Sequence, residues 1–190
     1  MNADAEAQER ARAYFRSKSA LAPAILREQI AAAFDALDGV LAAVPPERAA
    51  RRAIPGEWSI QEIADHLLET YRPGVDELRC LLAGQRPPGE PIPASLQSKA
   101  PLLRPWAWLL DGLRRAHRDV MDLLAGVPKD FATAARAPFV MVVNIPGPGG
   151  AVRPLHWVEE ADWKAYAIAS WRLHSIDHLN QARKVLAAGR

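Results

Sequence analysis

Apolar residues recur at alternating steps of three and four positions in long stretches of this chain, and that spacing limits the fold more than any other feature. The period is that of one face of an α-helix. It runs through residues 21–44, 59–84, 102–124 and 159–188. Four amphipathic helices bury their apolar faces by packing against one another. The sequence therefore predicts an all-α fold, a four-helix bundle.

Signals at the ends of these segments support the predicted boundaries. Ser59 stands three residues before Glu62, which is the spacing of a capping box at the start of a helix. The connection from that helix to the next, residues 84–101, is long and rich in proline. A connection of this length permits a crossover, so we expect the second and third helices to run parallel.

Two further segments lie outside the four helices. The long connection before the last helix, residues 126–158, contains PFVMVVNIPGPGGAVRPLHW, in which two apolar runs flank a Gly-Pro turn. This pattern predicts a small β-hairpin, and the length of the connection points to a role as a flap or a dimer contact. We expect residues 1–20, which are mostly polar, to form a helical extension ahead of a bundle domain at residues 21–190.

Composition argues against several classes of partner. The 190 residues include 24 basic and 22 acidic ones, and the resulting net charge of +2 does not indicate nucleic acid binding. The N-terminus has no hydrophobic signal core, and no apolar run reaches the length of a membrane span. Cys80 is the single cysteine, so no internal disulfide can form. We expect a cytoplasmic protein that acts on a small-molecule substrate, with no nucleic acid and no membrane as partner.

Tryptophan is more frequent than one small core obviously needs. The residues that suggest this are Trp106, Trp108, Trp157 and Trp163. Aromatic residues are enriched at protein interfaces. We therefore expect a homodimer that buries part of this set.

Two histidines, His174 and His178, share the apolar stripe of the last predicted helix with Trp171 and Val185. Residues four apart lie on one side of a helix, so both imidazoles can reach one metal ion. Their place on the stripe predicts that they face the core, where unpaired imidazoles would be costly. The alternative is a buried pair that is hydrogen-bonded to carboxylates or backbone, and without a third ligand that alternative is the better interpretation.

His66 supplies the third imidazole. It lies seven residues after the start of the second predicted helix, and His178 lies about ten residues before the end of the fourth. If these helices are antiparallel, the two sites lie ~10 and ~15 Å from the same end of the bundle. Three neutral imidazoles leave coordination positions open, which is typical of catalytic metal sites. We predict that His66, His174 and His178 are metal ligands.

Other polar residues near this set have weaker assignments. His117 sits about two turns away from the level of His66, so we expect a core histidine, and His156 in the long connection has no assigned role. Asp177 could orient an imidazole from outside the ligand set or be a solvated helix residue. Gln181 could touch a bound water or substrate. Glu62 could be a general base beside the metal, but its capping role already explains it.

The segments EWSIQEIADHL (residues 57–67) and HSIDHLNQ (residues 174–181) together resemble the DinB/YfiT-like superfamily of metal-binding proteins. The resemblance covers roughly residues 21–190. It implies a four-helix bundle in up-down-down-up order, with a divalent metal held by His66, His174 and His178. Members of the family include S-transferases that use bacillithiol or mycothiol, mycothiol-dependent maleylpyruvate isomerase, and metal-dependent hydrolases.

These observations lead to one functional hypothesis and two alternatives. We expect an enzyme in which a divalent ion (Zn, Ni, Fe or Mn) activates water or a thiol toward a small electrophilic substrate. A low-molecular-weight thiol would serve as cosubstrate in the transferase version. The rival is a metal-binding stress or binding protein without catalytic activity, and a further alternative is a bundle whose histidines are only core residues.

Overall fold

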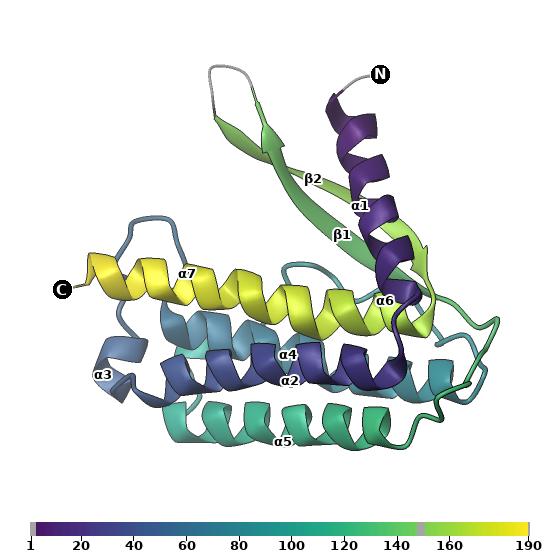
Figure 1. The fold of residues 1–190 in the computed structure, drawn as a ribbon. Coiled ribbons are helices and arrows are strands. Elements are labelled where there is room, and N and C mark those ends of the chain that lie inside the picture. Colours follow the sequence, from purple (N-terminus) through teal and green to yellow (C-terminus); the bar gives the residue numbers. More distant parts are fainter. Residues whose placement is uncertain (1–2, 148–150, 190) are drawn as a thin grey trace.

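The computed structural model describes residues 3–147 and 151–189, which are mostly helical with a small two-stranded antiparallel sheet (Figure 1). The body of the molecule consists of four long helices: α2 (Pro23–Ala42), α4 (Ile60–Leu82), α5 (Trp106–Ala125) and α7 (His174–Ala188). The other elements are helices α1 (Ala3–Ser19), α3 (Pro46–Ala49), η1 (Pro101–Leu103), α6 (Trp163–Ala167) and the π-helical segment η3 (Ile168–Leu173), and strands β1 (Ala137–Pro146) and β2 (Val152–Ala161).

Helix α4 starts where the sequence predicts. The Ser59 side chain accepts a hydrogen bond from the backbone N–H of Glu62, and the Glu62 carboxylate accepts one from the Ser59 N–H. Glu62 also pairs with Arg52, so a side chain that is only 2% exposed keeps its charge compensated. This capping box sets the register of α4 and therefore the position of every side chain that follows on it.

The contacts between helices show their relative directions. Gln61, near the start of α4, donates a hydrogen bond to the backbone carbonyl of Arg104 just before α5, and Leu68 lies against Gly112 about two turns further along both helices. These contacts ascend along both helices, so α4 and α5 run parallel. By contrast, Trp106 at the start of α5 donates to the carbonyl of Val44 just after α2, and Figure 1 shows α2 and α7 running opposite to α4 and α5.

The predicted hairpin is confirmed. Strands β1 and β2 pair antiparallel, with Ala137 opposite Ala161 at one end and Pro146 opposite Val152 at the other. Phe139 of β1 is buried and meets Phe15 of α1 edge-to-face at a ring distance of 5.8 Å. The hairpin and α1 therefore share an apolar contact, and both project from one end of the helical body (Figure 1). Most of the predicted Gly-Pro turn lies at residues 148–150, outside the described residues.

The last helix starts later than residue 159, so that predicted boundary is wrong. Residues up to Ala161 belong to β2, in which half-buried and exposed side chains alternate as expected for a strand. The helix begins at Trp163, where the Asp162 side chain accepts hydrogen bonds from the backbone of Lys164 and Ala165. Pairing with β1 extends β2 up to this N-cap. Helical periodicity in the sequence does not reveal that residues 159–161 pair as a strand instead of starting the helix.

The buried line of the last helix lies beside the predicted stripe and shares Trp171 and Val185 with it. The helical run continues from α6 through the π-helical segment η3 into α7. Beyond Trp171, the side chains that are fully buried are Ser175, Leu179, Ala182 and Val185. His174 and His178 are half-buried beside this line. The two histidines therefore lie at the edge of the core and not on its central line.

The predicted set of surplus tryptophans divides between core and surface. Trp106 and Trp163 are buried in the core, whereas Trp108 is exposed and contacts the guanidinium groups of Arg72 and Arg104, each 5.1 Å from the centroid of its ring. Packing within one chain thus accounts for part of the set, and the homodimer stays a prediction. Among the described helices, none combines the length and apolar character needed to cross a membrane.

Candidate metal centre

Three imidazoles from two helices meet at one point. His66 comes from the first half of α4, and His174 and His178 come from the first two turns of α7. One potential ligand atom from each lies within 4.8 Å of the other two. The ring centroids are 4.9 Å apart for His66 and His174, and 4.7 Å apart for His174 and His178. The three residues that the sequence singled out are therefore brought together.

Hydrogen bonds around the cluster determine which nitrogen of each ring faces inward. Nδ1 of His66 lies 2.7 Å from the carbonyl oxygen of Leu96, and Nδ1 of His178 lies 2.8 Å from Oε1 of Gln181. A carbonyl oxygen can only accept, so each Nδ1 carries the hydrogen and each Nε2 keeps its lone pair. His174 is hydrogen-bonded to the backbone of Ser170. An outer acceptor that fixes the tautomer and the ring orientation is the usual environment of a metal-binding histidine.

The contact between His66 and His174 tests whether an ion fits this site. Their Nε2 atoms lie 2.9 Å apart. Two imidazole nitrogens at this distance need a hydrogen or a cation between them, because their lone pairs repel. His178 adds a third nitrogen on the same side. Three imidazoles that converge in this way form a donor set suited to Zn, Ni, Fe or Mn.

Electrostatics keeps all three rings neutral. Burial lowers the pKa of His66, and burial with the adjacent charges of His178 and His66 lowers the pKa of His174 well below its usual range. Burial, followed by the charge of His66, lowers the pKa of His178 to about 4. The neutral imidazole is the form that binds a metal ion. At neutral pH no proton has to leave these rings before an ion binds.

The cluster opens onto a large cavity with a volume of about 1180 Å³. The three histidines are part of its lining, strand β1 from Phe139 to Pro146 forms one wall, and part of α1 contributes another. On the other side, the ring of Trp58 stacks on His178 at 14° between planes and a centroid distance of 6.1 Å. The site is therefore packed against protein on one side and accessible on the other.

The other candidate residues, Asp177, Gln181 and Glu62, lie outside the set of three histidines. Asp177 lines the same cavity, and burial raises its pKa, but the hydrogen bonds described for the imidazoles go to Leu96, Ser170 and Gln181 instead. Gln181, which was predicted to touch water or substrate, accepts from His178 and so orients it. Glu62 has both carboxylate oxygens occupied by Arg52 and the cap, and Arg52 lowers its pKa. The contacts of Glu62 match its role in the helix cap and not that of a general base beside the metal.

The other two histidines lie outside the cluster. His117 is buried in the core, stacked on Phe34 at 3.8 Å between ring centroids, with Nδ1 3.0 Å from a carboxylate oxygen of Asp38. His156 is exposed on β2, opposite Val142. Neither is near enough to share an ion with His66.

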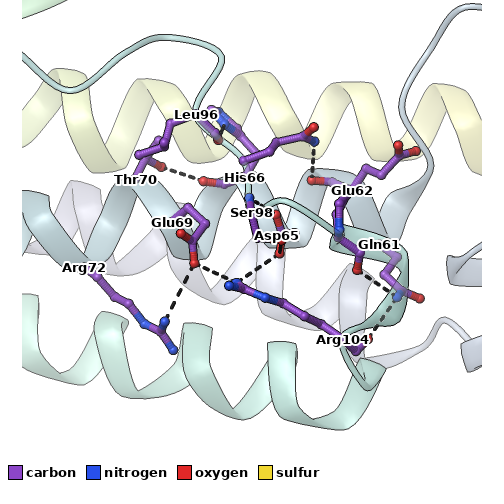
Figure 2. A network of polar contacts seen from close by, with 12 residues as sticks. Gln61, Glu62, Asp65, His66, Glu69, Thr70, Arg72, Leu96, Ser98 and Arg104 are labelled. Carbon is purple, nitrogen blue, oxygen red and sulfur yellow. Dashed lines mark hydrogen bonds and ion pairs between the residues drawn. The ribbon is translucent and has the colours of Figure 1, made fainter.

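Sequence reasoning missed three contributors to this site. The carbonyl of Leu96 and the backbone of Ser170 orient imidazoles, yet a backbone group leaves no signal in the residue type. Trp58 could have been found, because it precedes the capping serine in the same motif as His66. Figure 2 shows the connection that carries Leu96 lying along α4, attached by side chains of both segments.

Comparison with protein families agrees with the site geometry. Residues 29–182, which include all three clustered histidines, match the family model of the DinB superfamily. Comparisons with curated proteins and with solved structures found no match. The match covers most of the chain, so the protein belongs to the DinB superfamily.

Proposed function

We propose that His66, His174 and His178 hold a divalent metal ion, within an up-down-down-up bundle formed by α2, α4, α5 and α7. The bundle order is supported by the contacts that ascend along α4 and α5 and by the opposite course of α2 and α7 (Figure 1). The ligand assignment is supported by the 4.8 Å clustering of the ring nitrogens. It is supported equally by the outer acceptors at Leu96 and Gln181.

The bound ion would make this protein an enzyme that acts on a small electrophilic substrate, as an S-transferase or a hydrolase. When bound, such an ion acts as a Lewis acid and makes water or a thiol a stronger nucleophile near neutral pH. The single observation that carries this proposal is the cavity of about 1180 Å³ whose lining includes all three histidines. A metal site that only stabilises a fold is closed by four protein ligands, whereas a catalytic one keeps an open side.

The protein's own residues have distinct roles in this proposal. Trp58 stacks behind His178 and keeps water from that side of the ring. Strand β1 supplies an apolar wall through Phe139, Met141 and Ile145, which would exclude water from a bound substrate. Asp177 lines the cavity with a carboxyl whose pKa is raised by burial.

The test has two stages that separate an enzyme from a binding protein. Protein purified without a metal-affinity tag is first loaded with Zn, Ni, Fe or Mn and assayed for bound metal. Loaded protein is then offered esters, amides, and electrophiles together with low-molecular-weight thiols. Turnover that requires the metal and is lost in His66→Ala supports the proposal. Metal binding with no turnover of any of these classes favours the non-enzymatic alternative.

A further inference from the structure

Asp65 is fully buried next to His66 in the sequence, yet it takes no part in the ligand set. Consecutive residues on an α-helix point about 100° apart. Figure 2 accordingly shows Asp65 directed toward Ser98 and Arg104. A buried carboxylate is costly unless it is paired and hydrogen-bonded. At 0% exposure, the Asp65 carboxylate therefore depends on partners within the protein.

Each oxygen of the Asp65 carboxylate has a partner on the connection between α4 and α5. Oδ2 accepts from the backbone N–H of Ser98 at 2.8 Å, and Oδ1 accepts from the Ser98 hydroxyl at 2.8 Å. Arg104 brings its guanidinium to 3.0 Å from Oδ1 and also donates to Glu69 at 2.6 Å. Hydrogen bonds to an ionised acceptor are stronger than neutral ones. Asp65 therefore fastens Ser98 to α4 firmly.

Ser98 is the last residue of a short strap, residues 96–98, that lies along α4 (Figure 2). All three residues of the strap are attached to the helix. Ser98 binds Asp65, Gln97 donates to the carbonyl of Glu62 at 3.0 Å, and the Leu96 carbonyl accepts from Nδ1 of His66 at 2.7 Å. Only one residue, Gln97, separates Leu96, whose carbonyl orients His66, from Ser98, which Asp65 holds. Fixing one end of so short a segment restricts the other.

We propose that Asp65 is a positioning residue of the metal centre, which acts through Ser98 and the strap to hold the Leu96 carbonyl against His66. That carbonyl keeps the hydrogen of His66 on Nδ1 and aims Nε2 at His174 and His178. The inference rests on the proposed metal site. No side-chain replacement at Leu96 removes its backbone carbonyl. The positioning role is therefore tested at Asp65 and Ser98.

Two variants loosen the strap without touching a ligand. Asp65→Asn keeps the shape and one acceptor but loses the charge, and Ser98→Ala removes only the hydroxyl. Matched controls are Asp76→Asn on the exposed side of α4 and Ser95→Ala, which is exposed on the same connection. Ser98→Thr keeps the hydroxyl donor and serves as the rescue variant.

Two measurements are made on each protein. Zn²⁺ affinity is measured by competition with a chelator, and the tautomer of His66 is read from ¹⁵N NMR of the metal-free protein. We expect Asp65→Asn and Ser98→Ala to weaken Zn²⁺ binding about 10- to 100-fold, the usual effect of losing an outer partner of a ligand. Both should turn the single Nδ1–H tautomer of His66 into a mixture. The controls and Ser98→Thr should behave as wild type.

Unchanged Zn²⁺ affinity and an unchanged His66 tautomer in a folded Ser98→Ala would overturn the inference, even if the protein became easier to unfold. Such a result would leave Asp65 with a purely structural role. Failure of the proposed metal site itself looks different. In that case the wild type would not bind Zn²⁺, whereas the tautomer of His66 in the metal-free variants would still report whether Asp65 positions the ring.

Discussion

Acid should destabilise the metal-free protein through the histidine cluster, and His178 allows the effect to be worked out. Burial, followed by the charge of His66, lowers the pKa of His178 from 6.5 to about 4. The folded state therefore binds a proton at this ring less readily than the unfolded chain does. The resulting stability is fully present above pH 6.5, decreases as the pH falls, and is lost once the pH passes below about 4.

The magnitude follows from the two pKa values. At ~1.36 kcal/mol for each pH unit between 6.5 and about 4, the difference corresponds to ~3 kcal/mol. His178 is half-buried, so screening by solvent reduces this figure to ~2–3 kcal/mol. A neutral residue of similar size in its place, as in His178→Asn, would not titrate and should not show this loss.

Urea unfolding of both proteins, with a chelator present to keep them free of metal, measures the effect at pH 7 and pH 4. We expect the wild type to lose ~2–3 kcal/mol more than His178→Asn over this range. His156→Asn, at an exposed position on β2, should match the wild type at both pH values. Equal losses for wild type and His178→Asn would show that burial of this imidazole does not impose the low pKa.

Three further outcomes follow from the structure. In Gly112→Ala the new methyl group would lie 2.7 Å from a methyl carbon of Leu68, so we expect a loss of about 1–3 kcal/mol in urea unfolding. Ser59→Ala removes one half of the capping box, and the same assay should show a loss of about 1 kcal/mol. Added Zn²⁺ at 100 times its Kd should stabilise the wild type by about 2.7 kcal/mol but give little stabilisation of His174→Ala, a comparison made by thermal unfolding. Equal stabilisation of both would contradict the ligand assignment.

The sequence is sufficient for the parts of this fold that depend on local chemistry. The capping box at Ser59 and Glu62 fixes the start of α4, and the three–four spacing of apolar residues gives the long helices. Counting residues from helix ends was enough to place His66 near His174 and His178, because rise per residue is constant in a helix. These features need only side-chain type and position.

Other features depend on packing between distant segments, and the sequence does not reveal them. A three–four spacing in α7 allows two neighbouring lines that share Trp171 and Val185, and packing places Ser175 and Leu179, not the histidines, in the core. The strap at residues 96–98 contributes a backbone carbonyl, which any residue type offers equally. The buried Asp65 lies beside a ligand in sequence, but its partners come from a connection more than thirty residues away.

Metal content of wild type and of single histidine variants tests the central claim most directly. Protein purified without a metal-affinity tag is loaded, freed of excess metal and examined by elemental analysis. We predict one divalent ion for each wild-type chain, and sharp loss of that ion in His66→Ala, His174→Ala and His178→Ala. His117→Ala and His156→Ala should keep it, because both rings lie outside the cluster. Full occupancy in His66→Ala or His174→Ala, or loss of metal in His117→Ala, would contradict the three-histidine site.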